Sequence, residues 1–503
     1  MTLHWTALSQ LNHMKTTNSG KVMLLGAVLL CSSVAMTRIA GAADEYDVVI
    51  LNGRVMDPET GINANLNVGI RDGKIRAVTS SALRGRTTIE AKGLVVAPGF
   101  IDLHEHAQQP RSYAFQAHDG VTTSLELESG TDDVDKWYAE RAGKTLINYG
   151  VSIGESLVRM DVMAKSTDRS PLQEEEASHR APTAEEQVGI LDLMTKGLLQ
   201  GALAVGYDIN DTPGASRWEI YHSFQLAAKY DAMNDVHMRF LGTVEPGSAM
   251  EGLQELIADA VATGASLNVV HITSVGLRDT SRLLEVIKQA RARGIDISTE
   301  CYPYSAASGP LNTALFDPGW QERMGVSYND LQSAETGERL TAETFAKYRK
   351  EGVSVVIHLI PEEIVRQAVA DPTVMIASDG GAITGPKIHP RGQGTYSRVL
   401  GHYVREEKAL SLMDALRKMT LMPAQRLQKR APMFKEKGRI RVGADADITV
   451  FDPARIIDKA TYDDPLQYSE GVEFVLVNGV PVVRDGQLLN SVTPGLAARA
   501  PIR

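Results

Sequence analysis

Two histidines separated by one residue end an apolar run in the segment PGFIDLHEHAQQP, which covers residues 98–110. In a β-strand, residues two apart point to the same face, so His104 and His106 would project side by side. Paired imidazoles of this kind suit a divalent metal ion. A lone His-x-His pair is more often an ordinary polar strand end, so the rest of the chain must supply further ligands.

Further metal-binding residue types stand at the ends of later apolar runs. The run TTSLELES carries Glu126 and Glu128 on one face, and DVHMRF carries His237. The run SLNVVHIT carries His271, and VMIASDGG carries Asp379. Each residue alone is a weak signal, but their common position at run ends predicts one metal site.

The elements that must position these residues alternate along the middle of the chain. Strand-like apolar runs are followed by helical patterns such as RWEIYHSFQLAAKYDA. This order predicts parallel strands joined by right-handed crossovers. Eight such units predict an α/β fold, a (β/α)₈ TIM-type barrel with its active residues at the carboxyl ends of the strands.

A ninth strand-like run, VSVVIHLI, is left out of this count because it lies in a long insertion over residues 309–371. A structureless loop of that length is uncommon in a compact domain, so we expect the insertion to contain helices of its own. It follows the seventh strand, and we therefore expect it to lie over the active face and act as a lid.

The two ends of the chain after residue 43 have a different sequence pattern from this middle part. They contain short β-branched runs broken by Asn-Gly and Asp-Gly, which are hairpin signals. These patterns predict a small β-sandwich domain formed by both termini. The expected boundaries are 44–93 for its first part, 94–435 for the barrel with its insertion over residues 309–371, and 436–503 for its second part.

Residues 1–43 have the pattern of a secretory signal peptide. Lys15 and Lys21 precede the apolar run VMLLGAVLLCSSVAM, and the small residues of IAGAADE follow it. We expect cleavage after Ala42 or Ala43, export to the periplasm and no stable membrane span in the mature protein. The alternative is a single membrane anchor, for which the run is short.

Composition narrows the classes of partner. The chain has 503 residues, 43% apolar and 23% charged, which is typical of a soluble globular protein. A net charge of −10 without a basic tract argues against nucleic acid as a partner. It does not exclude a small anionic substrate, because a local arginine can outweigh the negative net charge. Removal of the signal peptide would leave Cys301 as the single cysteine, which excludes an internal disulfide. Whether the chain forms a homo-oligomer is left open.

Several segments resemble the amidohydrolase superfamily and, within it, the N-acyl-D-amino-acid deacylase (D-aminoacylase-like) group. The segments VVAPGFIDLHEH, VHMR, VVHIT and IASDGG resemble the strand motifs that carry the superfamily's metal ligands. MTLMPAQRL and GRIRVGADADITVFD are similar to its C-terminal signatures. CYPYSAASGPL and IHPRGQGTYSRVLGHYVRE resemble the deacylase group specifically.

The resemblance implies a metal-dependent hydrolase that cleaves an amide bond, with zinc as one or two divalent ions. Asp379 would be the catalytic acid–base group. Arg391, Tyr302 and Ser308 match positions that contact substrate, Arg391 pairing with a substrate carboxylate. The metal ligands implied are His104, His106, Glu128, His237, His271 and Asp379.

This chain departs from the group at two positions. Well-known D-aminoacylases carry a cysteine ligand just after GVTT, whereas this neighbourhood contains Glu128 and no thiol. They also carry a lysine two residues after the sixth-strand histidine, where this chain has Thr273. The alternatives are therefore a cyclic amidase or lactonase of the same superfamily, or a non-catalytic binding barrel.

Overall fold

The computed structural model describes residues 46–164 and 171–503. The predicted signal peptide, residues 1–43, lies outside the described residues. Among the helices of the described part, none is long and apolar enough to cross a membrane.

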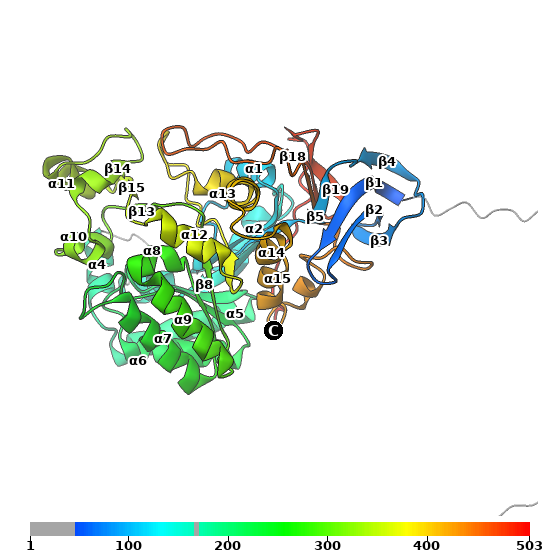
Figure 1. Cartoon of the computed structure of the whole chain (residues 1–503). Coiled ribbons are helices and arrows are strands. Elements are labelled where there is room, and N and C mark those ends of the chain that lie inside the picture. The colour runs from blue at the N-terminus through cyan, green and yellow to red at the C-terminus, as the bar shows by residue number, and fades with distance from the viewer. Residues whose placement is uncertain (1–45, 165–170) are drawn as a thin grey trace, which may run out of the picture. The chain divides into compact units, whose positions relative to one another are not determined.

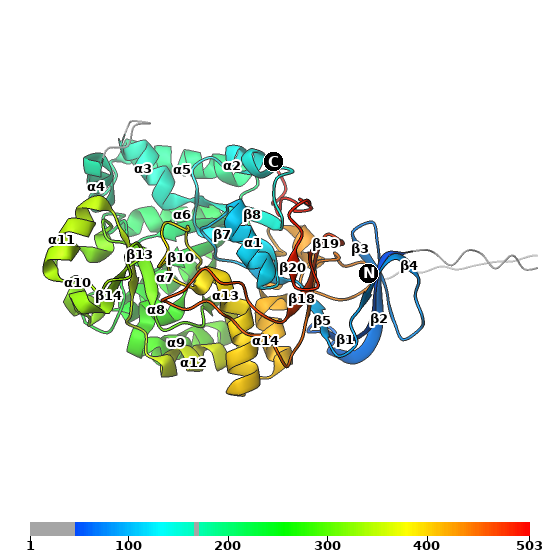
Figure 2. The ribbon, with the colours of Figure 1, turned by 90° about the horizontal axis from the view of Figure 1, so that it is seen from above.

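A sheet of eight parallel strands forms the barrel (Figures 1 and 2). Neighbouring strands follow one another in chain order, as crossover connections require. The eight strands predicted from the sequence are therefore confirmed, and their bounds are β6 (Phe100–Asp102), β7 (Val121–Thr131), β8 (Asn148–Gly154), β9 (Ala204–Asp208), β10 (Met233–His237), β11 (Ser266–Val269), β12 (Ile297–Cys301) and β16 (Val374–Ile376).

Backbone hydrogen bonds beyond the strand ends join the first strand to the last. The amide of Asp379 donates to the carbonyl of His104 over 2.7 Å, and the amide of His106 donates to the carbonyl of Gly380 over 2.8 Å. These bonds nearly close the barrel at the carboxyl ends of β6 and β16. As a result, residues from the first and eighth strands face one common space.

Helices cover the outside of the barrel, and α6 (Arg217–Lys229) shows why they form. The Ser216 side chain accepts a hydrogen bond from the Glu219 amide, and the Glu219 carboxylate accepts one from the Ser216 amide, which is a capping box. Ile220, Phe224 and Ala227 recur at helical spacing and are buried. The other covering helices are α1 (Pro110–His118), α2 (Val134–Arg141), α3 (Glu155–Ala164), α4 (Pro171–His179), α5 (Ala184–Leu199), α7 (Ala249–Thr263), α8 (Ile272–Gly276), α9 (Thr280–Ala292), α13 (Arg391–Arg398), α14 (Leu412–Met419) and α15 (Leu421–Leu427).

The insertion has its own structure, as expected. The ninth strand-like run forms β15 (Ser354–Ile357), which pairs antiparallel with β13 (Ala307–Pro310) and β14 (Leu331–Ser333) outside the barrel. This run therefore does not belong to the barrel, as predicted. The helices of this region are α10 (Trp320–Met324), α11 (Ala342–Glu351) and α12 (Glu362–Ala370).

Strands from both termini form a second, nine-stranded sheet with its own apolar core, which confirms the additional β domain. Figure 1 shows the N-terminal strands in blue beside β18 and β19 in red. The connection runs through β5, which pairs with β1 on one side and with β17 on the other. The strands are β1 (Tyr46–Asp57), β2 (Ile62–Arg71), β3 (Lys74–Thr79), β4 (Gly85–Glu90), β5 (Val95–Pro98), β17 (Ile448–Phe451), β18 (Val472–Val477), β19 (Val480–Arg484) and β20 (Gln487–Leu488).

The chain passes between the two sheets more than the predicted boundaries suggest. The run LVVAPGFIDLHEH is divided, since Val95–Pro98 pairs within the β domain and Phe100–Asp102 pairs within the barrel. After β20 the chain returns to the barrel, where the Ala498 amide donates to the Tyr149 carbonyl over 2.7 Å. Because LVVAPGFIDLHEH is mostly apolar, its hydrophobic pattern does not show where one strand ends and the next begins.

Candidate active site

The predicted metal ligands meet at the carboxyl ends of the barrel strands. His104 and His106 follow β6, Glu128 lies within β7, and His237 ends β10. The remaining two members, His271 and Asp379, follow β11 and β16 within three residues. This is the end of a (β/α)₈ barrel at which catalytic residues are found.

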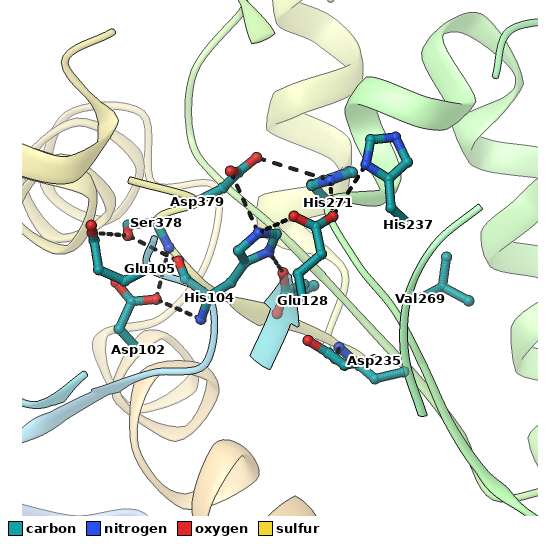
Figure 3. Close-up of polar contacts among 12 residues, drawn as sticks. Asp102, His104, Glu105, Glu128, Asp235, His237, Val269, His271, Ser378 and Asp379 are labelled. Carbon is teal, nitrogen blue, oxygen red and sulfur yellow. Dashed lines mark hydrogen bonds and ion pairs between the residues drawn. The ribbon is translucent and has the colours of Figure 1, made fainter. Parts of the chain in front are cut away.

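The carboxylate of Glu128 lies between two pairs of histidines, of which Figure 3 labels His104, His237 and His271. Its Oε2 lies 2.8 Å from His104 Nε2 and 3.2 Å from His106 Nε2. Its Oε1 lies 3.2 Å from His237 Nδ1 and 2.9 Å from His271 Nε2. Each carboxylate oxygen therefore faces one histidine pair, so that two groups of donor atoms share Glu128.

Asp379 belongs to the group that contains His104 and His106. Its Oδ1 lies 3.5 Å from the Nε2 atom of each of these histidines. Asp379 has a positive φ of 52°, an uncommon conformation that aspartate tolerates better than most residues. The carboxylate thus reaches the donor atoms from the last strand of the barrel.

The two glutamates of β7 have different partners. Glu126 Oε2 lies 2.9 Å from His106 Nδ1, on the opposite side of the imidazole from Glu128. The backbone amides of Ser129 and Gly130 also donate to Glu126 Oε1. Glu126 therefore orients a histidine, whereas Glu128 lies among the donor atoms, which supports choosing Glu128 over Glu126 as the ligand.

Two glycines allow the backbone to approach the site closely. A Cβ atom at Gly206 of β9 would lie 2.0 Å from the Glu128 carbonyl oxygen, so only glycine lets these strands pack. A Cβ atom at Gly380 would lie 2.0 Å from Glu105 Oε2. The Glu105 carboxyl is buried beneath this turn and bonds to Ser378 Oγ at 3.0 Å. Burial, with a contribution from nearby Asp102, raises the pKa of Glu105 to about 8.

A cavity of about 480 Å³ opens onto both donor groups. Residues from the insertion line one side of it, including Thr313, Ala334 and Ser354. The insertion therefore lies over the active face, as predicted. Its action as a lid stays a prediction.

The three predicted substrate contacts lie around this space. Arg391 and Ser308 line the cavity, and both also line a smaller adjoining space of about 60 Å³ that includes Tyr302. The Arg391 guanidinium carbon lies 4.7 Å from the centre of the Tyr302 ring, in a cation–π arrangement. Leu241, Val275, Leu315 and Met324 give the smaller space an apolar lining.

The structure adds residues that the sequence did not single out. Glu300 on β12 lies 2.7 Å from His104 Nδ1 and orients this imidazole. His389 lines the cavity and accepts a hydrogen bond from the Arg391 amide at 3.1 Å. Cys301 is buried, and burial raises its thiol pKa to about 12.

Comparison with known proteins is consistent with this geometry. A model of the amidohydrolase family matches residues 215–483, which is more than half of the chain. An N-acyl-D-glutamate deacylase from Alcaligenes xylosoxydans xylosoxydans is 29% identical over 87% of this chain and 94% of the relative. A D-hydantoinase from Ralstonia pickettii is 23% identical over 89% of this chain and 98% of the relative.

Among solved structures, an N-acyl-D-glutamate deacylase from Bordetella bronchiseptica has a TM-score of 0.79 and 26% identity. The match covers 91% of this chain and 100% of that protein, which was solved with zinc and a phosphonate mimic of the tetrahedral intermediate. The chain belongs to the amidohydrolase family. Its relatives place it in the D-aminoacylase-like group, and it is a hydrolase of carbon–nitrogen bonds other than peptide bonds.

Proposed function

We propose that the protein is a metal-dependent deacylase that removes the acyl group from an N-acyl amino acid of the D series or from a similar peptide-like small molecule. The observation that carries this proposal is the position of the Glu128 carboxylate. Its Oε2 faces His104 and His106, and its Oε1 faces His237 and His271. The names of the similar proteins support the same reaction class.

The donor set fits one or two zinc ions. Imidazole nitrogens and carboxylate oxygens are ordinary zinc ligands, and Glu128 is 3% exposed, so its charge is shielded from solvent. His104, His106, Glu128 and Asp379 would hold one ion, and Glu128, His237 and His271 the other. Bound zinc would supply Lewis acidity, which lowers the pKa of water and polarises a carbonyl group.

The protein's own groups would then handle the proton and the substrate. The Asp379 carboxylate would accept a proton from the attacking water and pass it to the leaving nitrogen. Arg391 would pair with the carboxylate of the amino acid, because a guanidinium binds carboxylates with two parallel hydrogen bonds. Tyr302 and Ser308 would border the bound amino acid.

A panel of potential substrates with metal analysis of the purified protein tests this proposal. We expect stoichiometric zinc and turnover of N-acetyl-D-amino acids in preference to the L series. Absence of bound metal after growth with zinc, together with no hydrolysis of any amide, would support the binding-barrel alternative instead.

A cyclic amidase is the second candidate, and the similarity to a D-hydantoinase favours it. Such an enzyme would use the same donor groups on a ring amide, and a lactonase would use them on a ring ester. Hydantoins, dihydropyrimidines and lactones therefore belong in the substrate panel. Turnover of a ring substrate well above that of every open-chain N-acyl amino acid would replace the deacylase proposal.

We also propose that the protein is exported to the periplasm after removal of residues 1–43. The proposal rests on the three-part N-terminal sequence pattern alone. Sequencing the N-terminus of protein recovered from a periplasmic fraction should give a start near Ala43. An intact Met1 or Met14 on the exported protein would contradict it.

A further inference from the structure

The large cavity carries far more negative than positive charge. A single arginine, Arg391, is the only Arg or Lys side chain among its described lining residues. Five carboxylates line the same space: Glu126, Glu128, Asp208, Asp211 and Asp379.

Three of these carboxylates already have positively charged or hydrogen-bonding partners. Glu128 and Asp379 lie among the histidines, and Asp379 also pairs with Arg391 at 2.7 Å. Glu126 is held by His106 and by two backbone amides. The negative charges of these three carboxylates are therefore balanced within the candidate metal site.

Asp208 and Asp211 remain, and we call them the acidic pair. Asp208 ends β9, and Asp211 lies three residues later in the loop before α6. Neither forms an ion pair with any Lys or Arg in the described parts of the chain. One oxygen of Asp211, Oδ1, is buried without a hydrogen-bond partner there, and the same holds for Nδ2 of neighbouring Asn210.

Carboxyl groups that line a cavity without a positively charged partner are costly to ionise, since a partly buried charge normally has one. The same cavity also contains a buried cationic group. Arg391 is 5% exposed, and its Nε has no hydrogen-bond partner among the described residues. The cavity therefore offers one cationic group, which pairs with Asp379, and, separately, two carboxyl groups that have no Lys or Arg partner among the described residues.

We propose that the acidic pair binds a cationic group of the substrate, an ammonium or a guanidinium. This inference rests on the proposed deacylase function and adds the charge of the substrate to it. A substrate with a carboxylate and a cation would satisfy both Arg391 and the acidic pair. An acidic side chain would be repelled, so the chain should differ in preference from the N-acyl-D-glutamate deacylases that it resembles.

Two kinds of substrate can supply the cation. It can be the side chain of a basic amino acid, as in N-acetyl-D-lysine, or the free amino group of a dipeptide such as glycyl-D-leucine. Matched neutral compounds separate these sources: N-acetyl-D-norleucine lacks the side-chain ammonium, and N-acetylglycyl-D-leucine lacks the free amino group.

The first experiment compares kcat/KM across these four compounds and N-acetyl-D-glutamate. We expect at least one cationic compound to exceed its neutral match by about 10-fold or more, the usual size of a hydrogen bond to a charged group. N-acetyl-D-glutamate should be the poorest substrate. Neutral or acidic compounds that equal or exceed both cationic ones would overturn the proposal.

The second experiment assigns any preference to the acidic pair. In D208N and D211N, the cationic-to-neutral ratio of kcat/KM should fall toward one. E140Q provides the matched control, because Glu140 lies on α2 with 57% of its side chain exposed, and its ratio should stay at the wild-type value. Unchanged ratios in both acidic-pair variants would contradict the assignment. Thermal unfolding identifies a variant that fails to fold, in which case the other variant and the wild-type series decide.

Binding separates failure of this inference from failure of the proposed function. Calorimetry with D-lysine and D-norleucine, which share the α-ammonium and the carboxylate and differ in the side-chain ammonium, needs no turnover. A preference for D-lysine over D-norleucine that disappears in D208N or D211N supports the acidic pair even if no amide is hydrolysed. Hydrolysis of N-acyl amino acids without any such preference would leave the deacylase function standing and reject the cation subsite.

Discussion

The guanidinium Nη1 of Arg391 lies 2.7 Å from Oδ2 of Asp379, so the proposed substrate anchor contacts the proposed catalytic carboxylate. Asp379 Oδ1 faces the histidines, while Oδ2 faces the arginine. The positive charge of Arg391 therefore lies next to the place where the scissile amide must bind. A substrate carboxylate bound to Arg391 would be positioned within a short distance of the reacting groups.

Replacing Arg391 by methionine should weaken recognition of the substrate carboxylate. A hydrogen bond to a charged group contributes about 1.5–3 kcal/mol, so kcat/KM should fall roughly 10- to 150-fold for N-acyl amino acids. The matching N-acyl amino acid amides, which lack the carboxylate, should lose less. Steady-state kinetics on both substrates checks this, and an equal loss on acid and amide would remove Arg391 from carboxylate binding.

Glu128 and Glu126 should differ in their effect on metal content. E128Q should lose bound metal and at least 100-fold in activity, because an amide cannot offer an anionic oxygen to each histidine pair. E126Q should keep most of its metal, since the remaining oxygen can still accept a hydrogen bond from His106. Elemental analysis with kinetics decides, and the reverse pattern would mean that Glu126 is the ligand.

Glu300 should act through His104. Its carboxylate lies 2.7 Å from His104 Nδ1. Removing a carboxylate that holds a metal-binding imidazole typically lowers metal affinity about 10- to 100-fold, and we expect a loss of about that size here. E300A should therefore release metal to a chelator more readily, and E300Q less so because it keeps an acceptor. E285Q, an exposed substitution on α9, is the control. Chelator resistance of E300A equal to that of wild type would contradict the role.

The barrel could be predicted because strand-like apolar runs alternate with helical patterns, and the site could be predicted because five of those runs carry metal-binding residue types near their ends. His104, Glu128, His237, His271 and Asp379 are far apart in sequence, but each stands at a strand end, and parallel strands bring their carboxyl ends together. The resemblance to the superfamily then named the reaction class.

The role of Glu300 could not be predicted in the same way, because its partner is distant in the sequence. Glu300 lies within the run IDISTECYPY, and its partner His104 comes from the first strand, 196 residues earlier. Only the nearly closed barrel brings β6 and β12 to one site. Asp208 did offer a signal, since it ends the run GALAVGYDI, but one strand-end carboxylate was not distinctive by itself.

The buried Lys418 should give the protein a stability change at alkaline pH. Its Nζ donates to the carbonyls of Val369 and Asp371 at 2.5 Å, and burial lowers its pKa to about 8 from 10.5. The folded state then releases its proton before the unfolded state does, so stability should rise from pH 8 to 10.5. A shift of this size corresponds to a gain of about 3 kcal/mol.

Lys418→Met tests this, because it removes the titrating group. The free energy of unfolding, measured by urea titration at pH 8, 9 and 10, should rise more steeply in wild type than in the variant. The variant should also be less stable at pH 8, since three buried carbonyls lose their donor. Parallel pH profiles for the two proteins would contradict the assignment to Lys418.

Asp379→Asn should cost far more in rate than in metal. The amide of asparagine cannot take up the proton of the attacking water, and general acid–base groups typically contribute 10²- to 10⁴-fold, so kcat should fall by about that factor. Asparagine tolerates the positive φ of 52° at this position, so the turn before Gly380 should keep its shape. Some metal loss is expected because Oδ1 lies 3.5 Å from both His104 and His106. Kinetics with metal analysis checks the variant against H104N, which should lose metal and activity together. Near-normal turnover with normal metal in the asparagine variant would make Asp379 a structural cap of the turn and would weaken the deacylase proposal as a whole.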